Sequence, residues 1–390
     1  GLAGLIKAAQ AVRYKTLPPN GQFEKLSGRF DLSGTCLYII KDSTPWQVKE
    51  GKTRLAAVSS FGFGGINYHC IVQEMTDSYE PVKRARLFAP GTDRNDRRIV
   101  IAGMGIALPD IKNAEDYWNL LESGKNILKE IPAARYHSEY YENEKDENYR
   151  LPKVKAGVFG DSAIDTKKFR MPPATLRSLD RTQFIGLECA GQALKQSGLP
   201  DKLEKGNKIA VVIGIMNGEK VLENIIRTRI PLINGIILSS NAADKNKLAP
   251  ISEKLALSLK ERFQINNEDT VPGLLSNIAS GRIANFYGCN GANYIIDANS
   301  ASSAVAMHLA WLGLRSGEYE YAITGGVDSN LTPASLRTMK RAGHLTSGQC
   351  RIFDEGSDGV NPSEGGALFV MTTYRNAVEK GMPVLAEIDS

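Results

Sequence analysis

The sequence lacks any long run of apolar residues. A helix needs roughly 20 of them to cross a bilayer, and the best stretch, IPLINGIIL at 230–238, is short and lies between charged segments. We therefore expect no membrane span. The N-terminus has apolar residues at helical spacing but neither the basic region nor the cleavage site of a signal peptide. These features predict a cytoplasmic chain that is an internal segment of a larger protein.

Paired cysteines and dense basic blocks are also missing. The five cysteines are scattered singly, which argues against zinc sites and small disulfide frameworks and predicts buried or incidental thiols. The net charge is +5, but the basic residues are spread out without interleaved aromatics. We therefore expect no metal and no nucleic acid, while an acidic protein partner is compatible with the charge.

Patterning along the chain predicts an α/β protein in two units. Residues 1–75 end like a finished domain, 76–96 are charged and aperiodic as in a linker, and 97–390 open a second unit. Apolar runs predict buried strands at 208–216, 293–299, 321–327 and 366–373. Helices are expected at 2–14, 114–123, 182–197 and 303–316.

The most informative stretch is IIDANSASSAVAMHLA, at 295–310. A strand runs into a turn of small residues at the start of a helix, where free backbone N–H groups favour an electrophile that acquires negative charge. Small residues before a helix are also typical of simple capping. The glycines Gly103 and Gly105, after the strand that opens the second unit, do not complete a dinucleotide-binding pattern, because Leu108 stands at the third glycine position.

The stretch resembles the nucleophile elbow of β-ketoacyl synthases, whose pattern is Asp-Thr-Ala-Cys-Ser-Ser-Ser. Residues 297–303 occupy those places, and Ser300 stands where the family has the cysteine that takes the acyl chain as a thioester. Asn299 departs from the usual alanine. A serine hydroxyl is far less acidic than a thiol and needs a general base that this turn does not supply.

Further segments extend the resemblance over about 97–390. They are RRIVIAGMGIALP, FRMPPATLRSLDRTQF and LTSGQCRIFDEGSDGVNPSEGGALFV. The resemblance implies a thiolase-like layered αβαβα fold, with mixed five-stranded sheets sandwiched by helices and two related halves. The half that begins at 97 is nearly complete, and the other half is represented only by its tail.

That tail comes first in the chain. SSFGFGGINYHCIV resembles the C-terminal loop and last strand of the family. By resemblance, the backbone N–H of Phe63 completes the oxyanion hole, and Gly62 and Gly64 permit close backbone approach. The order tail, linker, head predicts the end of one ketosynthase followed directly by a second ketosynthase-like unit. A circular permutation is the rival account.

The family segment that carries two catalytic histidines is missing. Decarboxylative condensation needs two imidazoles besides the thiolate, and this chain has four histidines, none in such a motif: His69, His137, His308 and His344. We expect none of them to be catalytic. As it stands, this copy is expected to be inactive in condensation.

Three functions are compatible with these observations. The chain is part of a polyketide or polyunsaturated-fatty-acid synthase whose second unit does not elongate and resembles a chain-length factor, or an active ketosynthase with an engineered cysteine-to-serine change, or a structural docking module. By resemblance, no cofactor is bound directly, because an acyl carrier protein supplies the phosphopantetheine arm. The other implied partner is a second ketosynthase-like unit, as a homodimer or a pseudo-heterodimer.

Overall fold

The chain divides into two compact units, Gly1–Arg86 and Leu87–Ser390. The computed structural model describes residues 2–20, 23, 25–27, 31–62, 67–75, 98–133, 135–160, 168–169, 171–200, 203–216, 218–239, 242–262, 268–346, 348–351 and 354–388. The expected linker, 76–96, lies outside the described residues. In the described part, no helix is both long and apolar enough to span a membrane.

The first unit is a helix packed on an antiparallel hairpin. Helix α1 (Leu2–Tyr14) covers strands β3 (Leu55–Phe61) and β4 (Asn67–Gln73), while β1 (Thr16–Leu17) pairs with β2 (Thr44–Pro45). The buried side of the helix is made of Ala8, Ala11 and Val12, whose spacing of three and one places them on one helical face. This confirms the expected helix at 2–14.

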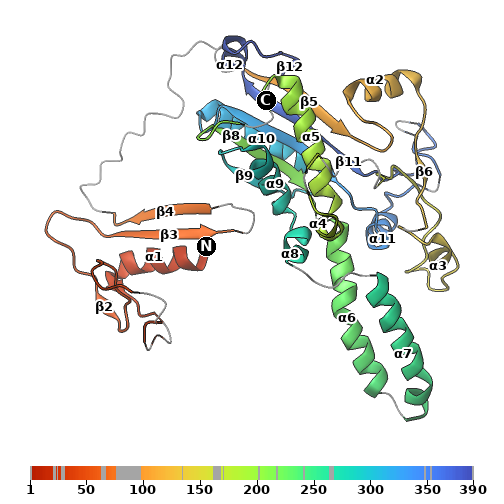
Figure 1. Ribbon diagram of the computed structural model, residues 1–390, viewed down its shortest axis with the longest axis horizontal. Coiled ribbons are helices and arrows are strands. Elements are labelled where there is room, and N and C mark those ends of the chain that lie inside the picture. Colours follow the sequence, from red (N-terminus) through yellow and green to blue (C-terminus); the bar gives the residue numbers. More distant parts are fainter. Residues whose placement is uncertain are drawn as a thin grey trace. The chain divides into compact units, whose positions relative to one another are not determined.

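The second unit is built on a mixed sheet with strand order β12-β5-β11-β10-β8-β9 (Figure 1). The strands are β5 (Ile99–Ala107), β8 (Ile209–Ile215), β9 (Asn293–Ile296), β10 (Tyr321–Asp328), β11 (Gly365–Thr373) and β12 (Ala386–Ile388). The strands β10, β8 and β9 run parallel, and β11 is antiparallel to both β10 and β5. The sheet has six strands rather than the expected five, because short β12 adds to the outer edge of β5.

Helices cover both faces of this sheet (Figure 1). On one face, α5 (Arg181–Ser197) and α9 (Asn277–Tyr287) pack on alternate residues such as Ile213 and Ile323. On the other face, α10 (Ser302–Ser316) packs on the intervening residues, including Val212 and Ala322. Every residue of β8 is buried, so its continuous apolar run reflects a central strand with helices on both sides.

Smaller elements complete the unit. They are α2 (Ala114–Ser123), β6 (Lys129–Glu130), α3 (Ser138–Glu142), β7 (Lys155–Ala156), α4 (Pro173–Ser178), α6 (Glu219–Ser239), α7 (Ala242–Arg262), α8 (Thr270–Leu274), α11 (Pro333–Arg341) and α12 (Tyr374–Glu379). The helices expected at 114–123, 182–197 and 303–316 are confirmed to within one residue.

The glycine of β5 at position 105 serves helix packing. A Cβ atom built there would lie 1.9 Å from the carbonyl oxygen of Cys189 on α5. Only a residue without a side chain allows α5 to lie so close to the strand. The contact accounts for a glycine that the sequence left without a role.

Candidate active site

The turn between β9 and α10 is stabilised by hydrogen bonds of one buried serine side chain. The buried hydroxyl of Ser302 accepts a 2.9 Å hydrogen bond from the N–H of Ala298 and donates a 2.6 Å bond to the carbonyl of Asn299. Asn299 has a φ of 53°, a left-handed conformation that asparagine tolerates better than most residues. Its N–H donates to the Asp297 carboxylate at 3.1 Å. The small residues of the turn therefore do more than cap the helix.

Ser300 lies exposed at the outside of this turn, just before α10. Its hydroxyl donates a 3.3 Å hydrogen bond to the side-chain oxygen of Asn299. The first N–H groups of α10 have no partner within the helix, and the helix dipole makes this end a favourable place for negative charge. The position suits an acyl-transfer centre, but the side chain is a hydroxyl.

Two glycines bring the start of α10 against the sheet. A Cβ atom at Gly214 of β8 would lie 2.5 Å from the carbonyl carbon of Ser302, and one at Gly326 of β10 would lie 2.7 Å from Cβ of Ser303. The absence of both side chains sets the depth at which the elbow lies over the strands. Sequence reasoning gave neither glycine a role, although both stand inside apolar strand segments, where glycine often marks close backbone approach.

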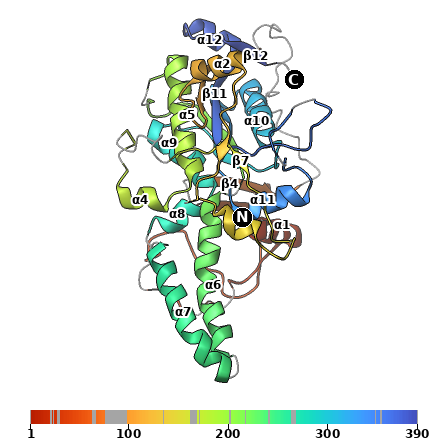
Figure 2. The same ribbon diagram turned by 90° about the vertical axis from the view of Figure 1, so that its right-hand side faces the viewer.

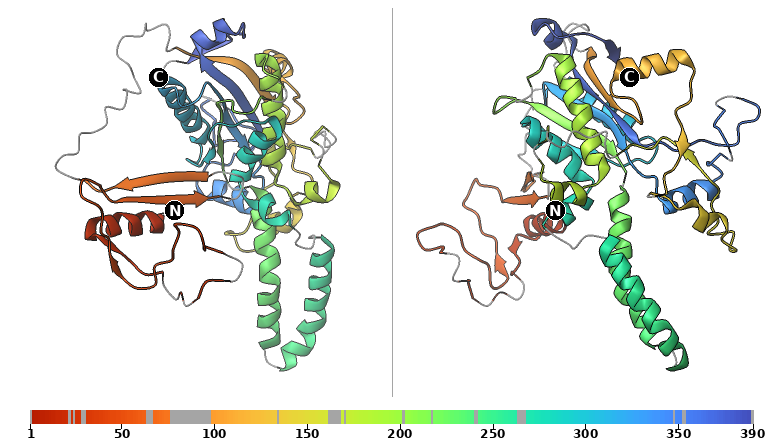
Figure 3. Two further views of the ribbon diagram at one scale, coloured as in Figure 1. Left: turned by 60° about the vertical axis from the view of Figure 1, so that its left-hand side comes forward. Right: turned by 45° about the vertical axis from the view of Figure 1, so that its right-hand side comes forward.

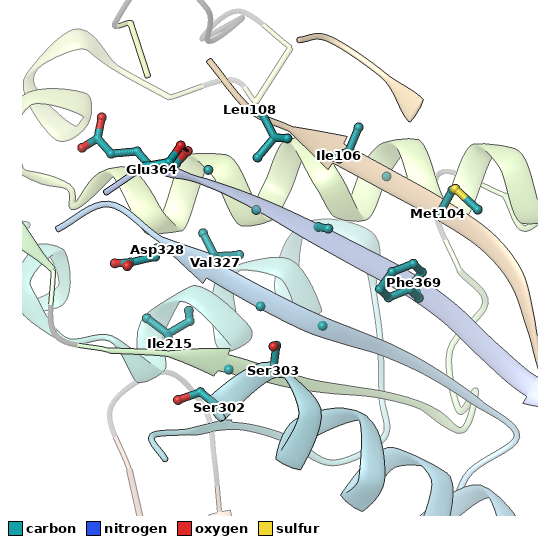
Figure 4. A pocket seen from close by; sticks show the side chains of 18 of the residues that line it. Met104, Ile106, Leu108, Ile215, Ser302, Ser303, Val327, Asp328, Glu364 and Phe369 are labelled. Carbon is teal, nitrogen blue, oxygen red and sulfur yellow. Dashed lines mark hydrogen bonds between the residues drawn. The ribbon is translucent and has the colours of Figure 1, made fainter. Parts of the chain in front are cut away.

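A cavity of about 790 Å³ opens beside the elbow (Figure 4). Its floor is formed by strand residues next to the start of α10, and one wall is formed by Tyr117 and Trp118 of α2. Figure 4 shows Met104 and Phe369 on neighbouring strands of the floor, with Ser302 and Ser303 at the helix end. Among its described lining residues there is no histidine.

Two carboxylates, Asp328 and Glu364, also line the cavity. Figure 4 shows them on the side away from Met104 and Phe369. The carboxylate of Glu364 forms a buried ion pair with Arg135 at 2.5 Å and accepts a 2.9 Å bond from the N–H of Phe159. Loss of solvent raises the pKa of the Asp328 carboxyl, and the charges of Glu364 and Asp180 act in the same direction. In the described part of the chain, no group of three or more histidine, cysteine or acidic residues could hold a metal ion.

None of the four histidines of the sequence is among the described residues that line the cavity. His308 is exposed on α10 and stacks on Trp311, with ring centroids 6.0 Å apart. It follows Ser300 by eight residues, or about two helical turns. His69 is on β4 of the first unit, hydrogen-bonded to Ser59 at 2.8 Å. His137 precedes α3, and His344 follows α11.

The structure does not test the predicted oxyanion loop. Gly62 lies exposed after β3 in the first unit, and Phe63 and Gly64 lie outside the described residues. The role of these three residues stays a prediction. The arrangement that the structure does describe is a turn before α10, a cavity beside it and the exposed Ser300 in the turn.

Comparison with known proteins shows the family. The model of the β-ketoacyl synthase N-terminal domain matches residues 96–377, which is more than half of the chain. The chain belongs to the β-ketoacyl synthase family. The expected thiolase-like fold is confirmed: solved ketosynthase structures match this chain, and the second unit has a mixed sheet with helices.

Several relatives are large synthases. The chain is 27% identical over 296 residues to a phenolphthiocerol/phthiocerol polyketide synthase of Mycobacterium tuberculosis, covering 74% of this chain and 12% of that protein. It is 26% identical to a polyunsaturated fatty acid synthase of Thraustochytrium, covering 75% of this chain and 10% of that one. The chain therefore spans only a small part of these relatives.

Two solved structures show the likeness in fold. The ketosynthase from module 6 of the bacillaene synthase of Bacillus subtilis 168 matches 74% of this β-ketoacyl synthase chain and 42% of its own, with 26% identity and a TM-score of 0.54. The structure described as PfaC keto synthase-chain length factor matches all of this chain and 40% of its own, with a TM-score of 0.74. At 19% identity, the second match speaks for the fold alone.

Proposed function

We propose that the chain joins the end of one ketosynthase to the start of a second ketosynthase-like unit that does not elongate and resembles a chain-length factor. The synthase would make a polyketide or a polyunsaturated fatty acid. The observation that carries the proposal is Ser300, which occupies the elbow with its hydroxyl bonded to Asn299 and has no histidine among the described residues of the adjoining cavity.

Chemistry separates this site from a working condensing site. A cysteine at a helix N-terminus ionises readily and attacks a thioester. A serine needs a general base within hydrogen-bond reach, and the hydroxyl of Ser300 donates to an amide oxygen, which cannot remove the proton at neutral pH. Such a unit would keep the shape of an acyl site without forming the acyl-enzyme.

The substrates follow from the family. Acyl and malonyl groups would arrive on the phosphopantetheine arm of an acyl carrier protein, so the chain would need no cofactor of its own. The cavity beside Ser300, about 790 Å³ and floored by Met104, Ile106 and Phe369, suits an apolar chain. It supports descent from an acyl-binding site over a purely structural docking module.

The tandem arrangement is compatible with the division of the chain into two compact units, Gly1–Arg86 and Leu87–Ser390.

The test is acylation of the elbow. The wild-type chain, Ser300→Cys and a matched Ser303→Cys variant are incubated with an octanoyl thioester of N-acetylcysteamine, and acylated peptides are mapped by mass spectrometry. The expected result is no acylation at position 300 in the wild type, and no more in Ser300→Cys than in Ser303→Cys. Rapid acylation confined to Ser300→Cys would instead favour an active enzyme whose cysteine was replaced.

A further inference from the structure

The turn that leads into α10 carries an asparagine whose side chain contacts the next residue. Helix α10 lies on one face of the sheet and α5 lies on the other (Figure 2 and the left-hand view of Figure 3). Asn299 stands directly before Ser300, and both residues line the cavity beside the turn. The amide of Asn299 is therefore the functional group that adjoins the Ser300 hydroxyl along the chain.

The backbone of Asn299 is held in place without help from its side chain. Its N–H donates to the Asp297 carboxylate at 3.1 Å, and its carbonyl accepts from the hydroxyl and the N–H of Ser302 at 2.6 and 3.0 Å. These bonds accompany a left-handed φ of 53°, which glycine adopts more readily than asparagine does. The conformation of the turn alone therefore does not account for an asparagine at this position.

The side-chain oxygen of Asn299 contacts the protonated form of Ser300. It accepts a 3.3 Å hydrogen bond from the Ser300 hydroxyl, so the hydroxyl must keep its proton for the bond to exist. A hydrogen bond to the neutral form of a group disfavours its charged form. The same acceptor would act in the same way on a thiol at position 300, because a thiol also donates through its proton.

The helix end acts on position 300 in the opposite direction. The unpaired N–H groups of the first turn of α10 favour negative charge, and a cysteine in such a place ionises more readily than usual. This effect is confined to the first turn and is weaker where the side chain is exposed to water, as Ser300 is. A neighbouring acceptor that bonds directly to the proton can therefore offset it.

We propose that Asn299 is a positioning residue that holds the proton of a nucleophile at position 300 and so keeps that nucleophile unreactive. The inference rests on the proposed function, because it takes Ser300 to stand at the nucleophile position, and it adds a second cause for the loss of acyl transfer. Serine in place of cysteine is the first obstacle, and the Asn299 amide oxygen is the second. A cysteine restored at position 300 would stay protonated at neutral pH until the amide is also removed.

The test measures the ionisation of a thiol at position 300 in the 390-residue chain. Ser300→Cys is compared with Ser300→Cys combined with Asn299→Gly, which suits the left-handed backbone and removes the amide. Both variants are alkylated with iodoacetamide between pH 5 and pH 10, and the label at position 300 is followed by peptide mass spectrometry. The glycine variant should lower the midpoint of the pH profile by about one unit. Since a more acidic thiolate is a weaker nucleophile, its rate at pH 7 should rise by only about threefold.

Two controls separate this effect from a general change in the turn. Asn299→Asp in the Ser300→Cys chain tolerates the same backbone conformation but places a negative charge beside the thiol, so the midpoint should rise. Ser303→Cys is measured with and without Asn299→Gly, and its midpoint should not move, because Cβ of Ser303 faces Gly326 on the sheet. Far-ultraviolet circular dichroism checks that each variant keeps its helices.

Other titratable groups near the turn are the same in every variant of each pair. They are Asp297, which accepts from the Asn299 N–H, and, among the described residues that line the cavity, Tyr117, Asp328 and Glu364. Their charges act on both members of a pair alike. A difference between the midpoints therefore reports the side chain at position 299.

The outcomes distinguish the role of Asn299 from the proposed function. Midpoints at position 300 that rise in the order glycine, asparagine, aspartate, with no change at position 303, are the expected result. A midpoint that Asn299→Gly leaves unchanged, or moves equally at both positions, would overturn the role of Asn299 and leave the proposed function intact. Rapid acylation of Ser300→Cys alone by the octanoyl thioester would overturn the proposed function, while the order of the midpoints tests Asn299 separately.

Discussion

The hydroxyl of Ser302 donates a 2.6 Å hydrogen bond to the backbone carbonyl of Asn299 and accepts one from the N–H of Ala298. The residue that stabilises the turn is therefore Ser302 and not Ser300, which we propose stands at the nucleophile position. Ser300 is displayed by a turn whose shape depends on Ser302.

Replacing Ser302 with alanine should destabilise the second unit by about 1–3 kcal/mol, because it removes two partly buried hydrogen bonds, to Ala298 and Asn299, each contributing about 0.5–1.5 kcal/mol. The measurement is the free energy of unfolding from urea titration. Ser303→Ala is the matched control and should change it by less than about 0.5 kcal/mol, since Ser303 is exposed at the next position. Equal losses in both variants would contradict the role of Ser302.

Gly326→Ala should loosen the elbow. The new methyl group would meet Cβ of Ser303 at 2.7 Å, and α10 must shift outward at a cost of about 1–3 kcal/mol. Gly235→Ala is the comparison, because Gly235 lies within α6 with open space around it, and alanine there should stabilise by about 0.5–1 kcal/mol. Thermal unfolding of the two variants should move in opposite directions; a neutral Gly326→Ala would refute the close approach.

Glu364→Gln should be strongly destabilising, by about 3–5 kcal/mol, because it removes the charge that faces Arg135 in a buried ion pair. The same change at Glu379, whose ion pair with Arg375 is exposed, should cost no more than about 0.5 kcal/mol. Denaturant unfolding at pH 7 measures both. Similar small losses would show that the Arg135 pair contributes little.

Thiol reactivity should divide the cysteines by burial. Burial raises the pKa of the Cys289 thiol to about 12 and also raises that of Cys189, whereas Cys36 and Cys70 are exposed. At pH 9, iodoacetamide should label the exposed pair quickly and the buried pair only after unfolding.

The raised pKa values of Cys189 and Cys289 should also make the stability of the fold depend on pH. Because the folded state keeps both buried thiols neutral while the unfolded state ionises them near their ordinary pKa of 9.0, stability should be unaffected well below pH 9 and should fall as the pH rises from 9 toward 12. In the iodoacetamide experiment, equal labelling rates for Cys36, Cys70, Cys189 and Cys289 in the folded chain would contradict the burial of the last two.

Local sequence patterns were sufficient to predict several strands and helices of this protein. The apolar run at 208–216 predicted β8, and the periodicity at 114–123 predicted α2, because strand and helix repeats are visible within a dozen residues. The elbow and Ser300 could be located from neighbouring residues alone, since the family pattern is contiguous. The roles of Phe63 and Gly64, which the structure does not describe, remain as the sequence predicts them.

Tertiary structure decided what depends on distant partners. Arg135 and Glu364 are 229 positions apart, and no local pattern pairs them. Gly326 matters because Ser303 lies over it, and the sixth strand exists because β12 returns to β5. The run at 230–238, which the sequence showed only as too short to cross a membrane, lies within α6, where Leu232 and Ile236 are exposed to solvent. Periodicity records which residues share a face, but only packing determines whether that face is covered.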